Sequence, residues 1–171
     1  MPDVRPDIEH KQHGPRVVHC FVLTGSDTRT VDTDTGGRAI VDLLNAAGHI
    51  VVGNAIVQDD AVEVRSVIEA QIVTVGVDAV ITTGGTGSTS RDSTYEAVIA
   101  LLEKRLDGFG ELFRMLSYEQ IGAAAMMSRA TAGLARGRIV IALPGSEAAV
   151  RLAMEKLVVP ELGHMVQQAR R

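Results

Sequence analysis

The feature that most constrains the fold of this chain is a regular alternation between short apolar runs and longer amphipathic stretches. Four runs have the length and composition of strands, namely residues 16–24, 49–57, 77–83 and 137–145. Amphipathic helical patterns cover 35–48, 64–72 and 95–106, and a last one covers 150–158, where Pro160 interrupts or ends it. Because strands and helices alternate, the sequence predicts an α/β fold with a parallel or mostly parallel sheet and helices on both faces.

Composition indicates one globular domain. Of the 171 residues, 46% are apolar and 22% are charged, which is typical of a soluble protein. We expect a flexible leader over residues 1–14 and a folded domain over residues 15–171. No apolar run is long enough to cross a bilayer and the N-terminus lacks a signal-peptide pattern, so we expect a cytoplasmic protein without a membrane partner. Cys20 is the only cysteine, which rules out an internal disulfide framework and a cysteine-based metal site.

The charge pattern argues against a nucleic-acid partner and indicates how a phosphate group would be recognised. The net charge is −4 and aromatic residues make up 3%, so neither the basic surface nor the stacking side chains of a nucleic-acid-binding protein are expected. Only three of the seventeen cationic residues are lysines. Any phosphate group would therefore be recognised by arginine side chains and backbone amides.

The predicted topology points to one edge of the sheet as the binding site. In parallel sheets, ligands bind beyond the carboxyl ends of the strands. Polar or glycine-rich segments follow all four predicted strands, at 24–30, 58–60, 83–92 and 144–146. We therefore expect one cleft to gather Asp27, Asp59, Gly85, Asp92 and Ser146.

The glycine-rich segment "ITTGGTGSTSRD" (81–92) has two interpretations. It is not a P-loop, because no lysine occurs between Lys11 and Lys104, and Ser90 breaks a dinucleotide fingerprint. In the first interpretation it is a tight turn, Asp92 helps to cap the next helix, and Ser93 and Glu96 form a capping box. In the second, bare backbone N–H groups bind phosphate. We favour the second, because "LPGS" (143–146) supplies another turn of this kind, and two anion sites suit a ligand with several phosphates.

Several blocks of the sequence, taken in order, resemble one known family. They are "TTGGTGSTSRDSTYEAV" (82–98), "GFGELFRMLSYEQIG" (108–122), "SRATAG" (128–133) and "IALPGS" (141–146), preceded by "SDT" (26–28) and "DTG" (34–36). These blocks are similar to the signatures of the MoaB/MogA family of molybdenum cofactor biosynthesis proteins, over roughly residues 16–165. The block at 108–122 resembles the MoaB branch more than the MogA branch.

The resemblance implies a fold, an assembly and an activity. The fold is a three-layer α/β/α sandwich of the molybdopterin-binding type, and the assembly is a homotrimer or homohexamer. The activity is the adenylylation of molybdopterin by ATP and Mg²⁺ with release of pyrophosphate, which is a nucleotidyltransferase reaction. Other enzymes of the molybdenum cofactor pathway are further expected partners. One alternative is a catalytically weak molybdopterin-binding oligomer that stores or passes on the cofactor precursor. Another is a hydrolase of nucleotide-like pyrophosphates.

Carried onto this sequence, the family's two essential acids fall on Asp59 and Asp92, which are also the candidate Mg²⁺ ligands. Ser90 and Gln58 stand where many members have proline, which loosens the loops that hold the acids and bears on the rate. Two alternatives stay open: Asp59 as a cap of the following helix, and Arg129 as an ordinary surface cation. The residues expected to bind nucleotide or pterin are Ser26, Asp27, Thr83, Gly84, Gly85, Thr86, Gly87, Ser88, Ser128, Pro144, Gly145 and Ser146.

The segment 108–127 adds apolar side chains outside the predicted strand and helix units. On a monomer these side chains would form a large exposed patch, which favours an oligomer. The residues concerned are Phe109, Leu112, Phe113, Met115, Leu116 and Ile121.

Overall fold

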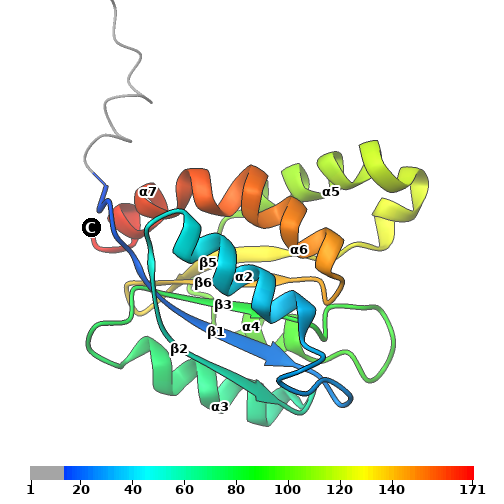
Figure 1. Ribbon diagram of the computed structural model, residues 1–171, viewed down its shortest axis with the longest axis horizontal. Helices are drawn as coiled ribbons and strands as arrows, with labels where there is room; N and C mark the ends of the chain where they lie inside the picture. Colours follow the sequence, from blue (N-terminus) through cyan, green and yellow to red (C-terminus); the bar gives the residue numbers. More distant parts are fainter. Residues whose placement is uncertain (1–13) are drawn as a thin grey trace, which may run out of the picture.

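A computed structural model describes residues 14–171 and consists of one six-stranded sheet between two layers of helices (Figure 1). The strand order is β2-β1-β3-β6-β5-β4. Strands β1 (His19–Gly25), β2 (Ile50–Val57), β3 (Ala79–Thr83) and β6 (Arg138–Leu143) pair in parallel, whereas β5 (Thr131–Ala135) and β4 (Lys104–Arg105) pair antiparallel. The predicted α/β class with a mostly parallel sheet is confirmed.

Each face of the sheet carries its own hydrophobic core. Helices α2 (Thr35–Ala46), α5 (Asp107–Ile121), α6 (Glu147–Ala153) and α7 (Val159–Ala169) cover one face, and α3 (Ala61–Ile72) and α4 (Thr94–Leu101) cover the other (Figure 1). Ile40, Leu44 and Phe113 are fully buried in the first core, and Val64 and Ile68 in the second. The central strands are therefore apolar on both sides, as expected of parallel strands between helices.

Cys20 of β1 belongs to the first core. Burial, together with the charge of nearby Asp78, raises the pKa of its thiol to about 12. The side chain is therefore an uncharged core group at neutral pH, since the thiolate is the reactive form of cysteine.

The last helical segment continues through the proline predicted to interrupt or end it. A π-helical turn, η2 (Met154–Val158), joins α6 to α7, and the N–H of Val159 bonds to the carbonyl of Met154. Pro160 lies in the first turn of α7, where its missing N–H is tolerated. The proline therefore interrupts the α-helical pattern without ending the helix.

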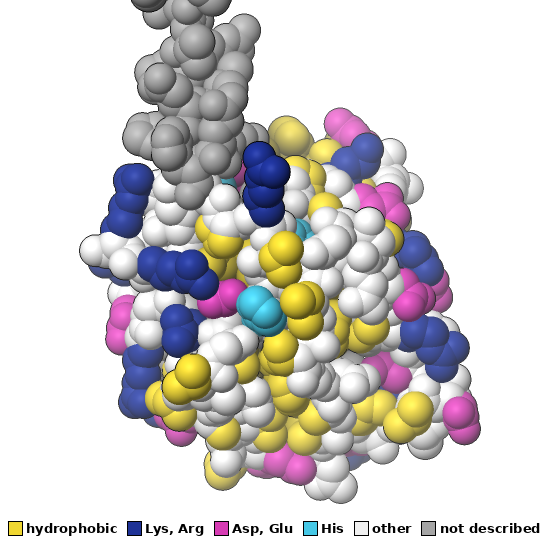
Figure 2. Space-filling model, turned by 60° about the vertical axis from the view of Figure 1, so that its left-hand side comes forward, with side chains coloured by type: hydrophobic (Ala, Val, Ile, Leu, Met, Phe, Trp, Pro, Cys, Tyr) yellow, Lys and Arg dark blue, Asp and Glu magenta, His cyan; other side chains and the backbone are white. Residues whose placement is uncertain are grey.

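Strand β2 forms an exposed edge of the sheet and carries a bulge. The pairing register shifts between Cys20 and Phe21, so that Val51 packs with the first core whereas Ala55 packs with the second. Figure 2 shows the side of the molecule that carries this edge, where hydrophobic side chains gather in a band bordered by charged ones. Bulges of this kind twist an edge strand and discourage pairing with another chain.

The described part of the chain begins at Gly14, at the end of the predicted leader. The expected flexible leader, apart from Gly14, lies outside the described residues. A Cβ atom on Gly14 would lie 2.7 Å from the carbonyl oxygen of Gly163, so the chain at residue 14 runs close against α7. Within residues 14–171, no helix is long and apolar enough to cross a membrane.

Candidate active site

A cleft of about 550 Å³ opens where the four parallel strands end. Asp27, Asp59, Gly85, Asp92 and Ser146 all line it, as the predicted topology requires. Ser26, Thr83, Gly84 and Gly145 also line it, whereas Thr86, Gly87, Ser88, Ser128 and Pro144 are not part of its wall. The remaining lining residues are Thr24, Gly25, Thr28, Arg29, Asp34 and Arg91.

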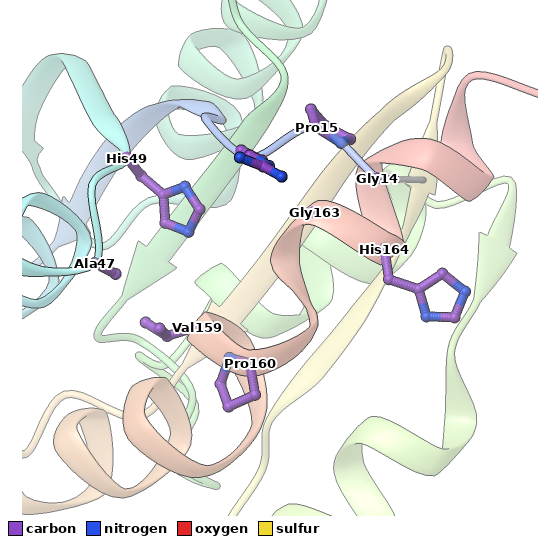
Figure 3. A pocket seen from close by; sticks show the side chains of 9 residues that line it. Gly14, Pro15, Ala47, His49, Val159, Pro160, Gly163 and His164 are labelled. Atoms are coloured by element: carbon purple, nitrogen blue, oxygen red, sulfur yellow. The ribbon is translucent and has the colours of Figure 1, made fainter. Parts of the chain in front are cut away.

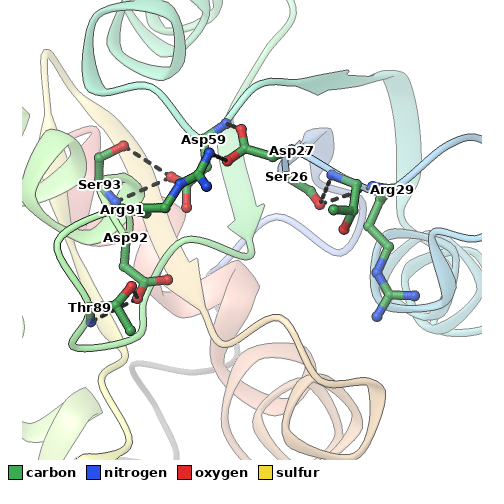
Figure 4. A network of polar contacts seen from close by, with 9 residues as sticks. Ser26, Asp27, Arg29, Asp59, Thr89, Arg91, Asp92 and Ser93 are labelled. Carbon is green, nitrogen blue, oxygen red and sulfur yellow. Dashed lines mark hydrogen bonds and ion pairs between the residues drawn. The ribbon is translucent and has the colours of Figure 1, made fainter.

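The loops after β1 and β2 are joined through Asp27 (Figure 4). One carboxylate oxygen of Asp27 accepts the N–H of Asp59 at 3.2 Å, and the other pairs with Arg91 at 3.2 Å. The hydroxyl of Ser26 accepts the N–H groups of Thr28 and Arg29 and so closes the turn before them. Ser26 and Asp27 thus shape the cleft wall.

The carboxylate of Asp59, a residue just before α3, contacts the start of α4 and does not cap α3. Its Oδ1 accepts the N–H of Ser93 at 3.2 Å and the hydroxyls of Ser93 and Thr94 at 3.0 and 3.2 Å. Asp60 caps α3 instead, because its Oδ1 accepts the N–H groups of Val62 and Glu63. The alternative that Asp59 caps the following helix is therefore wrong.

The predicted capping box at Ser93 and Glu96 does not form. Ser93 occupies the N-cap position of α4 but makes no side-chain cap bond, because its hydroxyl donates to Asp59. Glu96 pairs with Arg129 instead of reaching back to Ser93. A carboxylate from a distant loop has replaced the local cap, which spacing alone cannot reveal.

Asp92 is held inside its own loop. Its Oδ2 accepts the N–H of Thr89 at 2.9 Å and also the Thr89 hydroxyl (Figure 4). The hydroxyl bond from Thr89 is the main cause that holds the pKa of Asp92 below its usual value, so the carboxylate is charged at neutral pH. Asp92 does not cap α4, contrary to the tight-turn interpretation.

The glycines of the loop are required by the way the strand ends pack. Gly84 has φ +87° and Gly85 has φ +59°, a region that other residues rarely adopt. A side chain on Gly84 would overlap the carbonyl of Gly25, and one on Gly85 would overlap Asp59 Oδ1. Gly145 approaches the same turn, since its added Cβ would lie 3.3 Å from the Cα of Gly84. Close packing therefore accounts for these glycines, and their backbone also faces the cleft.

Arg129 clamps the glycine loop from behind. Its Nε donates to the carbonyl of Thr86 at 2.9 Å, and its guanidinium also contacts the carbonyl of Gly87 and the carboxylate of Glu96. The guanidinium lies over the ring of Tyr95, 4.5 Å from its centre. The bond from Arg129 lowers the pKa of Glu96, so the ion pair is charged at neutral pH. The interpretation of Arg129 as an ordinary surface cation is wrong.

Residue-based reasoning missed Asp34 as a wall residue of the cleft. Asp34 caps α2 by accepting the N–H of Gly37 at 2.9 Å, and it accepts the hydroxyl of Thr24 at 2.6 Å. An aspartate just before a helical pattern is an N-cap signal, and the preceding strand end would have placed it at this edge. The cleft therefore contains four carboxylates, from Asp27, Asp34, Asp59 and Asp92.

A second hollow, of about 660 Å³, lies between the chain at Gly14–Arg16 and α7 (Figure 3). His49 points into it and accepts the N–H of Val18 on Nδ1, and burial lowers the pKa of its ring. His164 points away and bonds with Glu161 and Gln168. The two imidazoles do not converge, so they cannot act together on one ligand. The lining of this hollow also has no carboxylate, whereas the cleft has four.

Together, the parallel strands and the polar cleft at their carboxyl ends define an α/β domain whose cleft lies where sheets of this kind bind their ligands. Residues 21–164 match the family model described as a probable molybdopterin binding domain. The chain belongs to the MoaB/MogA family of molybdenum cofactor biosynthesis proteins, in its MoaB branch. The family resemblance seen in the sequence is confirmed.

The relatives cover nearly the whole chain. Molybdenum cofactor biosynthesis protein B of Bacillus cereus is 50% identical over 164 residues, which is 95% of this chain and 97% of that protein. The Bacillus subtilis protein of the same name is 48% identical over 95% of this chain and 96% of its own length.

Two solved structures show the same fold. A crystal structure of molybdenum cofactor biosynthesis protein B has a TM-score of 0.89 at 49% identity, over 92% of this chain and 98% of that one. The tungsten cofactor synthesizing protein MoaB from Pyrococcus furiosus has a TM-score of 0.83 at 38% identity, over 92% of this chain and 99% of that one.

Proposed function

We propose that this chain binds molybdopterin and transfers an adenylyl group to it from Mg-ATP, with release of pyrophosphate. One observation carries the proposal. Asp59 and Asp92, from loops after different strands, line one cleft whose floor is the bare backbone of Gly84, Gly85 and Gly145. The match to a probable molybdopterin binding domain supports the pterin as substrate, and the glycine turns and carboxylates of the cleft support a phosphate-containing second substrate.

The proposed reaction joins two polyanions. An oxygen of the terminal phosphate of molybdopterin forms a bond to the α-phosphorus of ATP, and the bond from that phosphorus to the bridging oxygen breaks as pyrophosphate leaves. The chain's own contribution is to position the two phosphates and balance their charge. The N–H of Gly84 donates to the carbonyl of Leu143 at 3.2 Å, so the backbone N–H groups offered to the phosphates are those of Gly85 and Gly145, and Arg91 at the rim adds a positive charge.

The carboxylates suit Mg²⁺, which takes oxygen ligands, keeps several waters and needs only one or two protein carboxylates. Within residues 14–171 no three His, Cys, Asp or Glu side chains cluster as a metal cage. Asp92, ionised and fixed by Thr89, and Asp59, fixed at the start of α4, would hold the ion. When bound, the ion neutralises the charge of the phosphates.

A direct assay tests the proposal. The full chain is incubated with molybdopterin and with Mg-ATP labelled at the α-phosphorus, and the pterin is separated from nucleotide. Label in the pterin, with an equal amount of pyrophosphate, is the expected result. Absence of label with a chain that still binds both substrates contradicts adenylyl transfer.

A second candidate is a catalytically weak molybdopterin-binding oligomer. It is favoured by the contacts of Asp59, whose Oδ1 already accepts three hydrogen bonds that hold the start of α4 in place. In that case the two acids serve mainly to shape the pocket. Saturable pterin binding without label transfer is the result expected of this candidate.

We also propose that the chain assembles as a homotrimer or homohexamer. Helix α5 and the following turn η1 (Gly122–Met127) carry large exposed apolar side chains. Phe109 and Phe113, which were expected in the patch, are buried in the first core instead, and Leu116 is half-buried against it. The exposed side chains are Leu112, Met115, Tyr118, Ile121, Met126 and Met127.

A further inference from the structure

A third hollow, of about 240 Å³, lies between the first turns of α5 and the start of β5. It is separate from the cleft at the strand ends, because the two share no lining residue. Its wall includes Tyr95, whose ring also carries the clamp residue Arg129. The full lining is Tyr95, Arg105, Leu106, Asp107, Gly110, Glu111, Arg114, Ala130 and Thr131.

Arg114 is the unusual group in this hollow. Its side chain is half-buried, yet within residues 14–171 it makes no hydrogen bond and no ion pair. A guanidinium stays charged at any ordinary pH and presents five N–H donors. Its nitrogens are not among the described buried atoms without a partner, so they stay within reach of water and of an acceptor that a ligand would supply. The guanidinium is therefore a charged donor group that is free to bind an anionic ligand.

The backbone around Arg114 leaves space for the guanidinium. A Cβ atom on Gly110 would lie 2.8 Å from the carbonyl oxygen of Ala130 and 3.3 Å from Nη1 of Arg114. The missing side chain lets α5 approach β5 and lets the guanidinium fold back over the preceding turn, the direction in which helical side chains lean. Gly110 thus keeps the hollow open beside the cation.

Two neutral donors and one further cation complete the wall. The hydroxyls of Thr131 and Tyr95 have no hydrogen-bond partner among the described residues. Arg105 is already paired with Asp107 at 2.8 Å, so these two charges balance each other. Glu111 is the remaining acid of the lining and is exposed to solvent. The lining thus carries two arginines and two acids, and Arg114 is its one half-buried charge and makes no ion pair with Glu111.

We propose that this hollow binds a phosphate group, with Arg114 as its charged anchor and the hydroxyls of Thr131 and Tyr95 as further donors. A guanidinium fork matches the geometry of a phosphate, and hydrogen bonds between charged partners are stronger than neutral ones. The volume of about 240 Å³ accommodates a single phosphate with a small substituent. The proposal does not rest on adenylyl transfer.

Inorganic phosphate titrated into the isotope-labelled full chain, followed by amide NMR shifts, tests the site. We expect saturable shifts at Gly110, Ala130 and Thr131. Arg114→Gln is expected to weaken that binding by about tenfold or more, because a charged hydrogen-bond partner is lost. Thr131→Val, which keeps the shape of the side chain, is expected to weaken it several-fold.

Arg151→Gln is the matched control, because Arg151 is an exposed helical arginine that pairs with Glu147 away from the hollow. Its phosphate affinity should equal that of the unmodified chain. Shifts confined to Gly84, Gly85 and Gly145 would overturn the proposal, since they would place phosphate in the main cleft alone. Unchanged shifts at Gly110 and Thr131 in Arg114→Gln would overturn it as well. So would loss of the oligomer in Arg114→Gln without phosphate binding, which would assign Arg114 to a carboxylate of a second copy.

Discussion

Three aspartates near the cleft make different contacts, so the same Asp→Asn substitution at each of them separates their roles. Asp60 caps α3, Asp59 holds the start of α4, and Asp92 holds Thr89 in the glycine loop. If transfer needs the charges of Asp59 and Asp92, replacing either by Asn lowers kcat by about 10²–10³-fold. Asp60→Asn should keep the full rate, because Asn and Asp cap helices about equally well. Label transfer from α-labelled ATP, followed over time, gives the rate of each of the three variants.

The melting temperatures of the same variants separate chemistry from folding. Asn at residue 59 retains an oxygen that accepts bonds from Ser93 and Thr94, so the three variants should melt close to the unmodified chain. A normal rate in Asp92→Asn would assign that carboxylate to loop structure alone. If Asp59→Asn lowered both the rate and the melting temperature, the carboxylate of Asp59 would likewise be assigned to structure, at the start of α4.

Arg129 binds the glycine-rich segment from outside, whereas Arg91 belongs to the segment and pairs with Asp27, and their side chains are 28% and 83% exposed. Arg129→Gln leaves the carbonyls of Thr86 and Gly87 without their donor, so we expect a loss of about 1–3 kcal/mol in the free energy of unfolding. Arg91→Gln breaks a single exposed ion pair and should cost less than about 1 kcal/mol. Urea unfolding of both variants gives the comparison, and equal losses would show that Arg129 is no clamp.

At the scale of whole elements, Asp78 ties three of them together. Located just before β3, it accepts the N–H of His19 in β1 at 3.1 Å and pairs with Arg170, after α7, at 2.7 Å. Burial raises the pKa of this carboxyl, but the bonds from His19 and Arg170 outweigh that effect, so the pKa lies below its ordinary value of 3.8. The carboxylate therefore stabilises the fold above that pH, and the contribution is lost as the pH falls through the folded-state pKa.

Asp78→Asn should lower the free energy of unfolding by about 1–3 kcal/mol at pH 7, because it removes the charge that faces Arg170. The difference from the unmodified chain should shrink as the pH falls below 3.8, where Asp78 itself becomes protonated. Asp42→Asn, on the exposed face of α2, is the control and should change little. A difference that stays constant from pH 7 into the acid range would show that the charge of Asp78 contributes nothing.

The elements that were predicted from sequence are those whose pattern is local. Strands β1, β2, β3 and β6 were identified because parallel strands between helices are nearly continuous apolar runs. Strand β5 was missed because "TAGLA" is short and contains a glycine, and it becomes a strand only by pairing antiparallel with β6. Helix α5 was read only as an apolar excess, since glycines at 108 and 110 obscure its first turn.

The candidate site divides in the same way. Topology placed the strand ends together, so the residues that follow them were predicted to share a cleft. Contacts across the chain were not predictable, such as the cap that Asp59 gives α4 over 34 residues and the clamp that Arg129 forms over 43. These contacts depend on loop conformations that only the folded structure defines.

For the whole molecule, the exposed apolar side chains of α5 and η1 lie outside both cores, so their burial needs another chain. Met115 and Ile121 are each 54% exposed on this surface. We expect the unmodified protein to scatter light as a particle of three or six times the chain mass of 18.2 kDa. Met115→Asp and Ile121→Lys should shift it toward a single chain, because a charge buried in an apolar interface without a partner is strongly unfavourable.

Val75→Asp is the matched control for this assembly. Val75 is 97% exposed in the turn after α3 and, like Met115, is a large apolar side chain in contact with solvent. If exposure alone governed association, all three variants would dissociate equally, whereas an interface on α5 predicts that Val75→Asp keeps the assembly. A particle of 18.2 kDa at micromolar concentration for the unmodified chain would contradict the proposed oligomer and leave α5 as a solvent-exposed apolar surface.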